Sequence, residues 1–343
     1  MKPTPRRRAR SIGAALALAA IAAATPAHAL VINALFDSSI TSLSNASAIE
    51  QAFNTAASAF DTALTNPVTV NIQVSWGKVN TTKIAAGDVG ETLTPDLGTY
   101  TYAQVKTALT NAATTSTDAT VLKNLQTSSA AGNAFLIPQA EAKALGLIAA
   151  TGSAIDGYIG FGSSTPFSFT DSKGVAAGTY DFLAVAKHEI AEVLGRQSGL
   201  LAPSPLYATP FDLFRYSAKG KGTFSYTGAA FASIDGGVTN LGALNNSTSG
   251  GDRADWLTTS ATNDVQDAFI STGKVLSLSS QDLTLLDALG WSSIPATTAL
   301  RNGVIGATVT TDQADLPEPL SVTILASGIA GIAAACRGRR RAA

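Results

Sequence analysis

The sequence predicts an α+β fold in one large domain, and three features of the chain support this prediction. A helical pattern of apolar residues at 47–64 is followed directly by a strand-like alternation of apolar and polar residues at 67–76. A second, strongly apolar helical pattern follows at 181–194. The segment after it is rich in Gly, Ser and Thr, so we expect the C-terminal half of the domain to be irregular.

The first helix and the strand after it have the clearest patterns. In the segment Ser47–Leu64, one helical face carries Ile49, Phe53, Phe60 and Leu64. In the strand, every second residue is apolar: Val68, Val70, Ile72, Val74 and Trp76. Polar residues occupy the positions between them, which predicts a strand that is buried on one face only.

Shorter elements complete the body of the protein. In order, we expect helices at Ala103–Ala113, Ala119–Leu125 and Gln139–Leu145, a short strand from Gly157, and the apolar helix Asp181–Leu194. Gly195 is a natural stop for this last helix. The stretch SSQDLTLLDALGW predicts a final amphipathic helix, which places Leu283, Leu286 and Leu289 on one face.

Residues 1–29 have the three parts of a secretory signal peptide. The basic stretch MKPTPRRRAR precedes the apolar stretch SIGAALALAAIAAA, and TPAHA ends at Ala29 with a small-x-small cleavage pattern. A buried N-terminal helix would not explain an arginine cluster placed directly before the apolar run. We therefore expect an exported protein whose mature chain starts near Leu30.

Composition excludes some classes of protein. Charged residues make up 14% of the chain and its net charge is -1, so no basic face for binding nucleic acid is expected. The single cysteine is Cys336, so no intramolecular disulfide can form. The stability of the domain at 30–293 must therefore come from its core.

The stretch KHEIAEVLGRQS contains the residues most suggestive of chemistry. His188 and Glu192 are four positions apart, so on a helix both side chains point toward one place, with Glu189 beside it. In zinc hydrolases this spacing lets two side chains bind the metal while the glutamate between them acts as general base. The chain has two histidines and His28 lies in the signal peptide, so Glu192 must replace the second histidine of an HExxH motif.

A helix without metal also explains this stretch. Glu192 and Arg196 are four positions apart in the favourable order, acid before base, and could form a salt bridge on a surface helix. HExxE alone does not decide between the two interpretations.

Several stretches of the body have a distinctive sequence: HEIAEVLGR, PFDLFRYSAKG, FASIDGGVTNL, GGDRADW and LLDALGW. Together they resemble a bacterial metalloprotease family that has a metzincin-like core and is associated with PEP-CTERM tails, and the resemblance runs from about Val31 to Trp291. It implies a metzincin-like single catalytic domain, with a twisted, mostly parallel sheet and an active-site helix. It also implies zinc as the cofactor and a protein or peptide as the substrate. Compared with the metzincin motif HExxHxxGxxH, Ser198 stands at the third ligand position, and the mature chain has no methionine for a Met-turn.

The C-terminal segment resembles a PEP-CTERM sorting signal. After a linker at 294–314, the tail at 315–343 contains Pro-Glu-Pro at 317–319, an apolar run at 320–336 and a cluster of arginines. The run is near the lower limit of ~17–25 residues for a transmembrane helix, and the arginines would stay cytoplasmic. The resemblance implies transient anchoring in the inner membrane and processing by an exosortase near the triplet. A simple membrane anchor is the alternative.

The third metal ligand must come from outside the helix. Asp212, in FDLFRYS, is the leading candidate, and a turn-capping carboxylate is the equal alternative. Asp235, Asp252 and Asp255 lie among glycines, where tight turns are the simpler explanation and calcium sites the other.

The leading hypothesis is an exported metallopeptidase. His188 and Glu192 would hold zinc or another divalent transition metal, and Glu189 would be the general base for a water that attacks the peptide carbonyl. The alternatives are a catalytically inactive metzincin-like surface or matrix protein, and an adhesive module stabilised by calcium.

Overall fold

The computed structural model describes residues 30–126, 134–200, 207–247, 250–259 and 263–294, and the backbone of 316–317 and 322–325. The predicted signal peptide lies outside these residues, as do nearly all of the linker and most of the sorting tail. Among the described residues, no helix is both long enough and apolar enough to cross a membrane. Part of the apolar run predicted to span the membrane, Val322–Leu325, is described as a strand.

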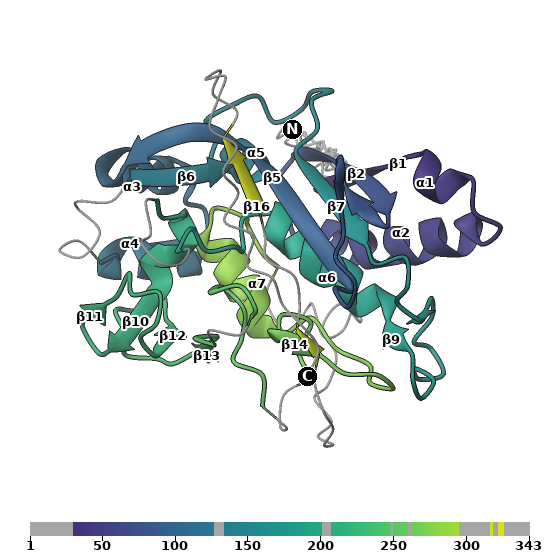
Figure 1. Ribbon diagram of the computed structural model, residues 1–343. Coiled ribbons are helices and arrows are strands. Elements are labelled where there is room, and N and C mark those ends of the chain that lie inside the picture. Colours follow the sequence, from purple (N-terminus) through teal and green to yellow (C-terminus); the bar gives the residue numbers. More distant parts are fainter. Residues whose placement is uncertain are drawn as a thin grey trace, which may run out of the picture.

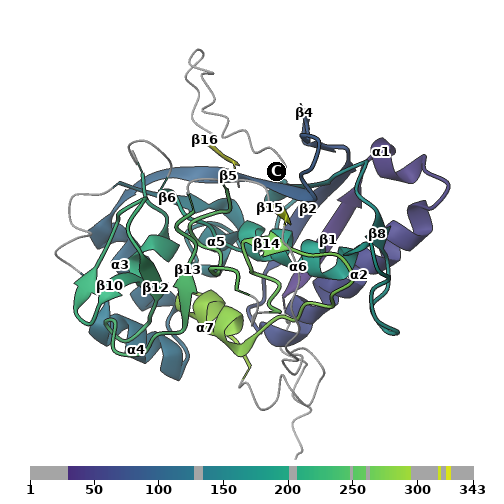
Figure 2. The ribbon, with the colours of Figure 1, turned by 60° about the horizontal axis from the view of Figure 1, so that its bottom comes forward.

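The main sheet is mixed and has the strand order β1-β2-β7-β5-β16, with β6 also paired to β5. Its strands are β1 (Val31–Phe36), β2 (Thr69–Trp76), β5 (Gly90–Thr101), β6 (Ala134–Pro138), β7 (Gly157–Phe161) and β16 (Val322–Leu325). Strands β1, β2 and β7 are parallel, whereas β5 runs antiparallel to β7 and β6. The long strand β5 crosses the molecule close to α5 and α6 (Figures 1 and 2).

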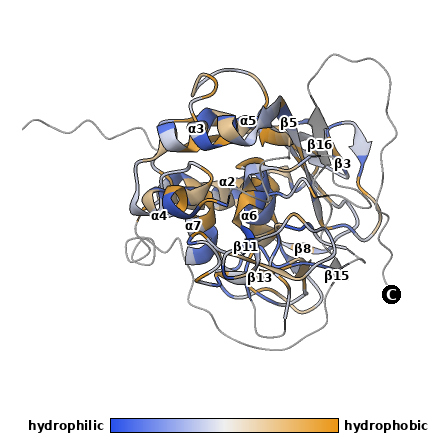
Figure 3. Cartoon of the chain, turned by 90° about the vertical axis from the view of Figure 1, so that its left-hand side faces the viewer, coloured by the Kyte–Doolittle hydropathy of each residue, from blue (hydrophilic) through white to orange (hydrophobic). Residues whose placement is uncertain are grey.

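Two helices lie against one side of this sheet. Helix α2 (Ala46–Ala63) packs on β1, and helix α6 (Phe182–Val193) packs on both α2 and β5 (Figure 1). Aromatic rings fill the space near the start of α6, where the Phe161 and Phe182 centroids are 4.4 Å apart. The remaining helices are α1 (Ser38–Thr41), α3 (Tyr102–Ala112), α4 (Ser116–Asn124), α5 (Gln139–Ala144) and α7 (Ser280–Ala288). Helices α4 and α7 each show hydrophilic and hydrophobic faces, as expected of helices at the edge of a core (Figure 3).

The chain after α6 is mostly irregular, as predicted. It forms a short 3-10 helix, η1 (Pro210–Phe214), and a small antiparallel sheet in the order β11-β10-β12-β13. The strands of this sheet are β10 (Arg215–Ala218), β11 (Lys221–Gly222), β12 (Ala230–Ala232) and β13 (Gly242–Leu244). Three two-stranded pairs complete the described structure: β3 (Lys78–Val79) with β4 (Thr82–Lys83), β8 (Phe167–Ser168) with β9 (Tyr180–Asp181), and β14 (Phe269–Ile270) with β15 (Leu316–Pro317).

The α+β prediction is confirmed, but the strand β2 differs from its prediction. Its polar face is only partly solvated, because Asn71 and Ser75 are both buried. Asn71 donates hydrogen bonds to the carbonyls of Gly152 and Ala154, and Ser75 donates to Asp37. Buried polar groups are tolerated where such partners exist, and alternation alone did not reveal these partners.

Candidate metal centre

Helix α6 is a buried helix, and its first residues explain where it starts. Asp181 is the N-cap, and its Oδ1 accepts hydrogen bonds from the backbone N–H groups of Leu183 (3.0 Å) and Ala184 (3.2 Å). Burial raises the pKa of Asp181 to about 6, although hydrogen bonds from the N–H groups of Ala184 and Leu276 oppose the shift. Every residue of α6 except Lys187 is buried. The interpretation of this segment as a surface helix is therefore wrong.

His188, Glu192 and Asp255 converge on one point in the interior. Their ligand atoms all lie within 4.8 Å of one another. The Nε2 atom of His188 is 3.6 Å from Glu192 Oε1 and 3.8 Å from Asp255 Oδ1. These distances are longer than those of hydrogen bonds, which are ~2.7–3.2 Å. Atoms held ~2.0–2.2 Å from one tetrahedral metal ion would be roughly 3.3–3.6 Å apart, so the two separations from His188 Nε2 are at or slightly above the range for a small cation.

The orientation of the His188 ring is fixed by its other nitrogen. Nδ1 lies 2.9 Å from the backbone carbonyl oxygen of Val265. A carbonyl only accepts hydrogen bonds, so Nδ1 must carry the proton and Nε2 is the nitrogen that faces the two carboxylates. This is the usual arrangement of a histidine that binds metal through Nε2.

Strand β5 holds Glu189 beside this point. The Thr92 hydroxyl donates to Glu189 Oε2 at 2.6 Å. The approach is so close that a Cβ on Gly90 would lie 2.5 Å from Glu189 Oε1. A glycine at the start of β5 therefore makes room for the carboxylate that the sequence predicts as the general base.

Arg196 does not pair with Glu192. Its Nη2 lies 3.4 Å from Asp282 Oδ1, its Nη1 donates to the Gln266 side chain, and its guanidinium stacks over Trp256 at 4.5 Å. Arg196 is fully buried. The alternative of a Glu192–Arg196 salt bridge is wrong, because packing of the C-terminal half of the domain turns the arginine toward Asp282.

Asp212 has a different role from the predicted ligand. Its Oδ1 accepts from the Ser198 hydroxyl at 2.6 Å, and its Oδ2 accepts from the backbone N–H groups of Gly199 (3.0 Å) and Thr209 (2.9 Å). Burial raises the pKa of Asp212, and Arg215 opposes that shift. Asp212 thus caps η1 and is not among the three converging residues, which agrees with the alternative of a capping carboxylate. Ser198, at the third ligand position of the metzincin motif, donates its hydroxyl hydrogen bond to this capping carboxylate.

The third carboxylate comes instead from Asp255, in the GGDRADW stretch. The sequence singled out Asp255 only as a turn or calcium candidate, because nothing in a linear pattern shows which loop folds back over α6. Asp252, its neighbour, accepts from the N–H groups of Ser198 (3.1 Å) and Ala254 (2.6 Å) and so fixes this loop. Burial, together with the nearby charge of Glu192, raises the pKa of Asp252 to about 7. Asp235 accepts from the N–H groups of Val238 and Thr239, which is a tight turn.

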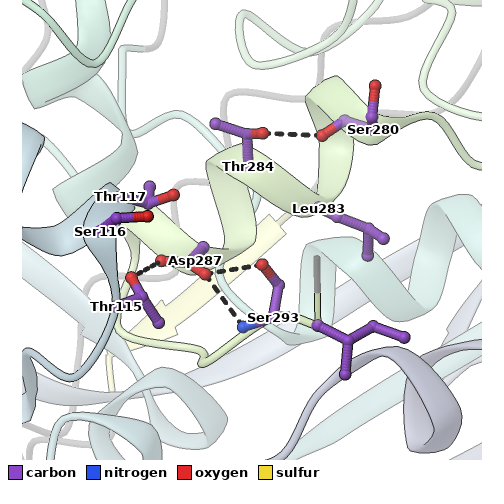
Figure 4. Close-up of a pocket in the computed structure, with 9 residues that line it drawn as sticks. Thr115, Ser116, Thr117, Ser280, Leu283, Thr284, Asp287 and Ser293 are labelled. Atoms are coloured by element: carbon purple, nitrogen blue, oxygen red, sulfur yellow. Dashed lines mark hydrogen bonds between the residues drawn. The ribbon is translucent and has the colours of Figure 1, made fainter. Parts of the chain in front are cut away.

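A pocket of ≈ 340 Å³ lies between the start of α4 and helix α7, away from these residues (Figure 4). Its lining is rich in hydroxyl groups, and Asp287 accepts from Thr115 Oγ1 (2.5 Å) and Ser293 Oγ (2.6 Å) there. None of the candidate ligands or Glu189 lines this pocket, so it does not bear on the metal centre.

Comparisons with known proteins add nothing to this picture. No protein-family model, curated protein or solved structure was found to match the chain.

Proposed function

We propose that this protein is an exported metal-dependent peptidase in which His188, Glu192 and Asp255 hold one divalent transition metal ion. The observation that carries the proposal is that one ligand atom from each of these three residues lies within 4.8 Å of the other two. The backbone carbonyl of Val265 holds Nδ1 of His188, which leaves Nε2 of the same ring to face the two carboxylates. Zinc suits one imidazole and two carboxylates, and this oxygen-rich set also suits manganese or iron.

The charge of the group supports the binding of a divalent ion. Two carboxylates and a neutral imidazole carry a charge of about −2, and all three residues are buried. Within the described residues, Glu192 Oε1 accepts no hydrogen bond. Burying a carboxylate without a hydrogen bond or a positive charge beside it costs free energy of folding. A divalent cation would neutralise the combined charge of His188, Glu192 and Asp255.

The residues around the site suit hydrolysis. The bound ion would supply Lewis-acid chemistry. Glu189, oriented by Thr92, would take a proton from the attacking water and later give it to the leaving amine. With helix α6 packed against the antiparallel strand β5, the layout of sheet and helix supports a metzincin-like fold as part of this proposal.

The edge of β5 supports a peptide as the substrate class. On the side of β5 away from β7, residues Leu93–Asp96 pair in parallel with Val322–Leu325. This edge therefore accepts an extended chain beside Thr92 and Glu189, and extended peptides bind proteins in this way through backbone hydrogen bonds.

Measurements of metal content and of peptidase activity distinguish the proposed metal ligands from the proposed general base. Elemental analysis of the purified wild-type protein should give about one equivalent of metal, and Glu192→Gln and Asp255→Asn should each lower metal affinity by ~10-fold or more. Glu189→Gln should keep the metal and lose ~10²-fold or more of peptidase activity. Glu50→Gln, a substitution on α2 outside the site, is the control and should change neither.

Two results would overturn the proposal. Wild-type protein that takes up no transition metal would exclude the metal centre. Metal-loaded protein that cleaves no peptide in a broad substrate library would leave an inactive scaffold, which is the alternative function.

A further inference from the structure

A second pair of buried carboxylates lies away from the metal centre, where β5, α5 and the end of α6 meet. On β5, the side chains of Thr92, Thr94 and Asp96 alternate inward and all are buried. Thr92 donates to Glu189, and Thr94 accepts from Gln197 Nε2 at 2.8 Å. Asp96 is the next residue in this row, and neither of its oxygens accepts a hydrogen bond from any described residue.

Glu141 faces the same region from α5. Asp96 pairs with Pro138 in the sheet, and Glu141 lies in the first turn of the helix that follows Pro138. Glu141 is fully buried, and both of its oxygens also lack hydrogen-bond partners in the described part of the chain. Burial raises the pKa of Glu141 well above its usual value, and the nearby Asp96 raises it further.

Glu141 also touches the end of the helix that carries the metal ligands. A Cβ built on Gly195 would lie 2.7 Å from Glu141 Oε2, so only glycine leaves room for the carboxylate there. Gly195 has φ +109 and follows the last turn of α6, where the helix dipole is negative. Two carboxylates and a helix C-terminus therefore bring negative potential to one buried place.

Such a place can be neutralised by protons on the two carboxyl groups or by a cation, and a proton shared between the two groups would require a hydrogen bond. Carboxyl groups that share a proton form a hydrogen bond with each other, as Asp264 and Asp282 do elsewhere in this molecule. Asp96 acts on Glu141 through its charge rather than through a hydrogen bond. Oxygen atoms that bind one cation from two sides stand apart, each ~2.3–2.6 Å from a calcium ion.

We propose that Asp96 and Glu141 bind one hard divalent cation, calcium by its preference for oxygen ligands, and that this ion fixes the C-terminal end of α6 against β5 and α5. The site is separate from the centre at His188, and it does not depend on peptidase activity. The Gly-Asp turns of the C-terminal half, the earlier candidates for calcium, have backbone partners for Asp235 and Asp252 instead.

The test is the thermal midpoint of the full chain after treatment with EGTA and reconstitution with zinc. Calcium at ~100-fold above its Kd should raise the midpoint by roughly 5 °C or more. Glu141→Gln and Asp96→Asn keep the side-chain volume and should each abolish the calcium response. Asp61→Asn, a change at a partly buried carboxylate elsewhere, and His188→Ala should both keep it.

Two results would overturn the inference. A calcium response that survives both Glu141→Gln and Asp96→Asn would place the ion elsewhere. A midpoint that ignores calcium and falls as pH rises through about 8, the raised pKa of Asp96, would show a protonated pair instead. Direct calcium analysis of the purified wild-type protein covers the case in which a variant does not fold.

Discussion

At the scale of single residues, the candidate centre depends on neighbours that orient its side chains. Val265 sets which nitrogen of His188 faces the carboxylates, and Thr92 sets where the Glu189 carboxylate lies. Neither neighbour titrates near neutral pH or binds metal through its side chain. Thr92 contacts the proposed base and none of the proposed ligands, so its effect on activity should be separable from metal binding.

Thr92→Val tests this separation. The substitution keeps the β-branched shape and removes the hydroxyl that donates to Glu189 at 2.6 Å. Without this hydrogen bond the Glu189 carboxylate should be less well placed to take a proton from the attacking water. We expect activity near neutral pH to fall ~10-fold while metal content stays constant. Loss of metal in this variant would mean that Thr92 supports the ligands rather than the base.

At the scale of elements, patterns of apolar residues predicted most of the helices but only part of the sheet. The helix predicted at Ser47–Leu64 is α2, and that predicted at Asp181–Leu194 is α6. Strand β5 was not predicted, because its sequence GETLTPDLGTYT contains two glycines and a proline, and its inward side chains are polar. Of these polar residues, Thr92 donates a hydrogen bond to Glu189 and Thr94 accepts one from Gln197. Asp96 is a ligand of the proposed cation. The third ligand of the candidate site could not be predicted either. Asp255 is far from His188 and Glu192 in the sequence, and the spacing of residues along the chain does not show which loop folds onto α6.

The N-cap of α6 gives a prediction at this scale. The pKa of Asp181 is about 6 in the folded protein, above its ordinary value of 3.8, because burial disfavours the charged form. The folded state therefore holds the proton more tightly, and this group's contribution to stability falls as pH rises from about 4 to about 6. The loss is on the order of 3 kcal/mol.

Asp181→Asn keeps a good N-cap and removes the titration, so denaturant unfolding between pH 4 and 6 should show a flatter profile than the wild type. Asp181→Ala should flatten the profile too, and should cost about 1 kcal/mol more because the cap is lost. An unchanged slope in Asp181→Asn would assign the pH dependence to other carboxylates with a raised pKa, such as Asp61.

At the scale of the whole molecule, the segment Val322–Leu325 has one structure in the sorting-signal prediction and another in the folded domain. The sorting-signal prediction requires the apolar run at 320–336 to enter a membrane as a helix, whereas Val322–Leu325 is a strand paired with β5. Both cannot hold at once. Release of the tail after export would also leave the edge of β5 open to a peptide. The proposed peptidase activity therefore depends on whether the tail is removed.

Processing of the tail can be followed through one thiol. The chain has a single cysteine, Cys336, which lies beyond the Pro-Glu-Pro triplet. Cleavage near that triplet removes every thiol from the protein, so the mature exported form should not react with a maleimide reagent, even when denatured. Mass spectrometry of the same sample should place the N-terminus near Leu30 and the C-terminus near the triplet. Replacing Pro-Glu-Pro by three alanines should preserve the thiol and leave the protein in the membrane fraction. A reactive Cys336 in wild-type protein from the native host would instead mean that the tail is a permanent anchor.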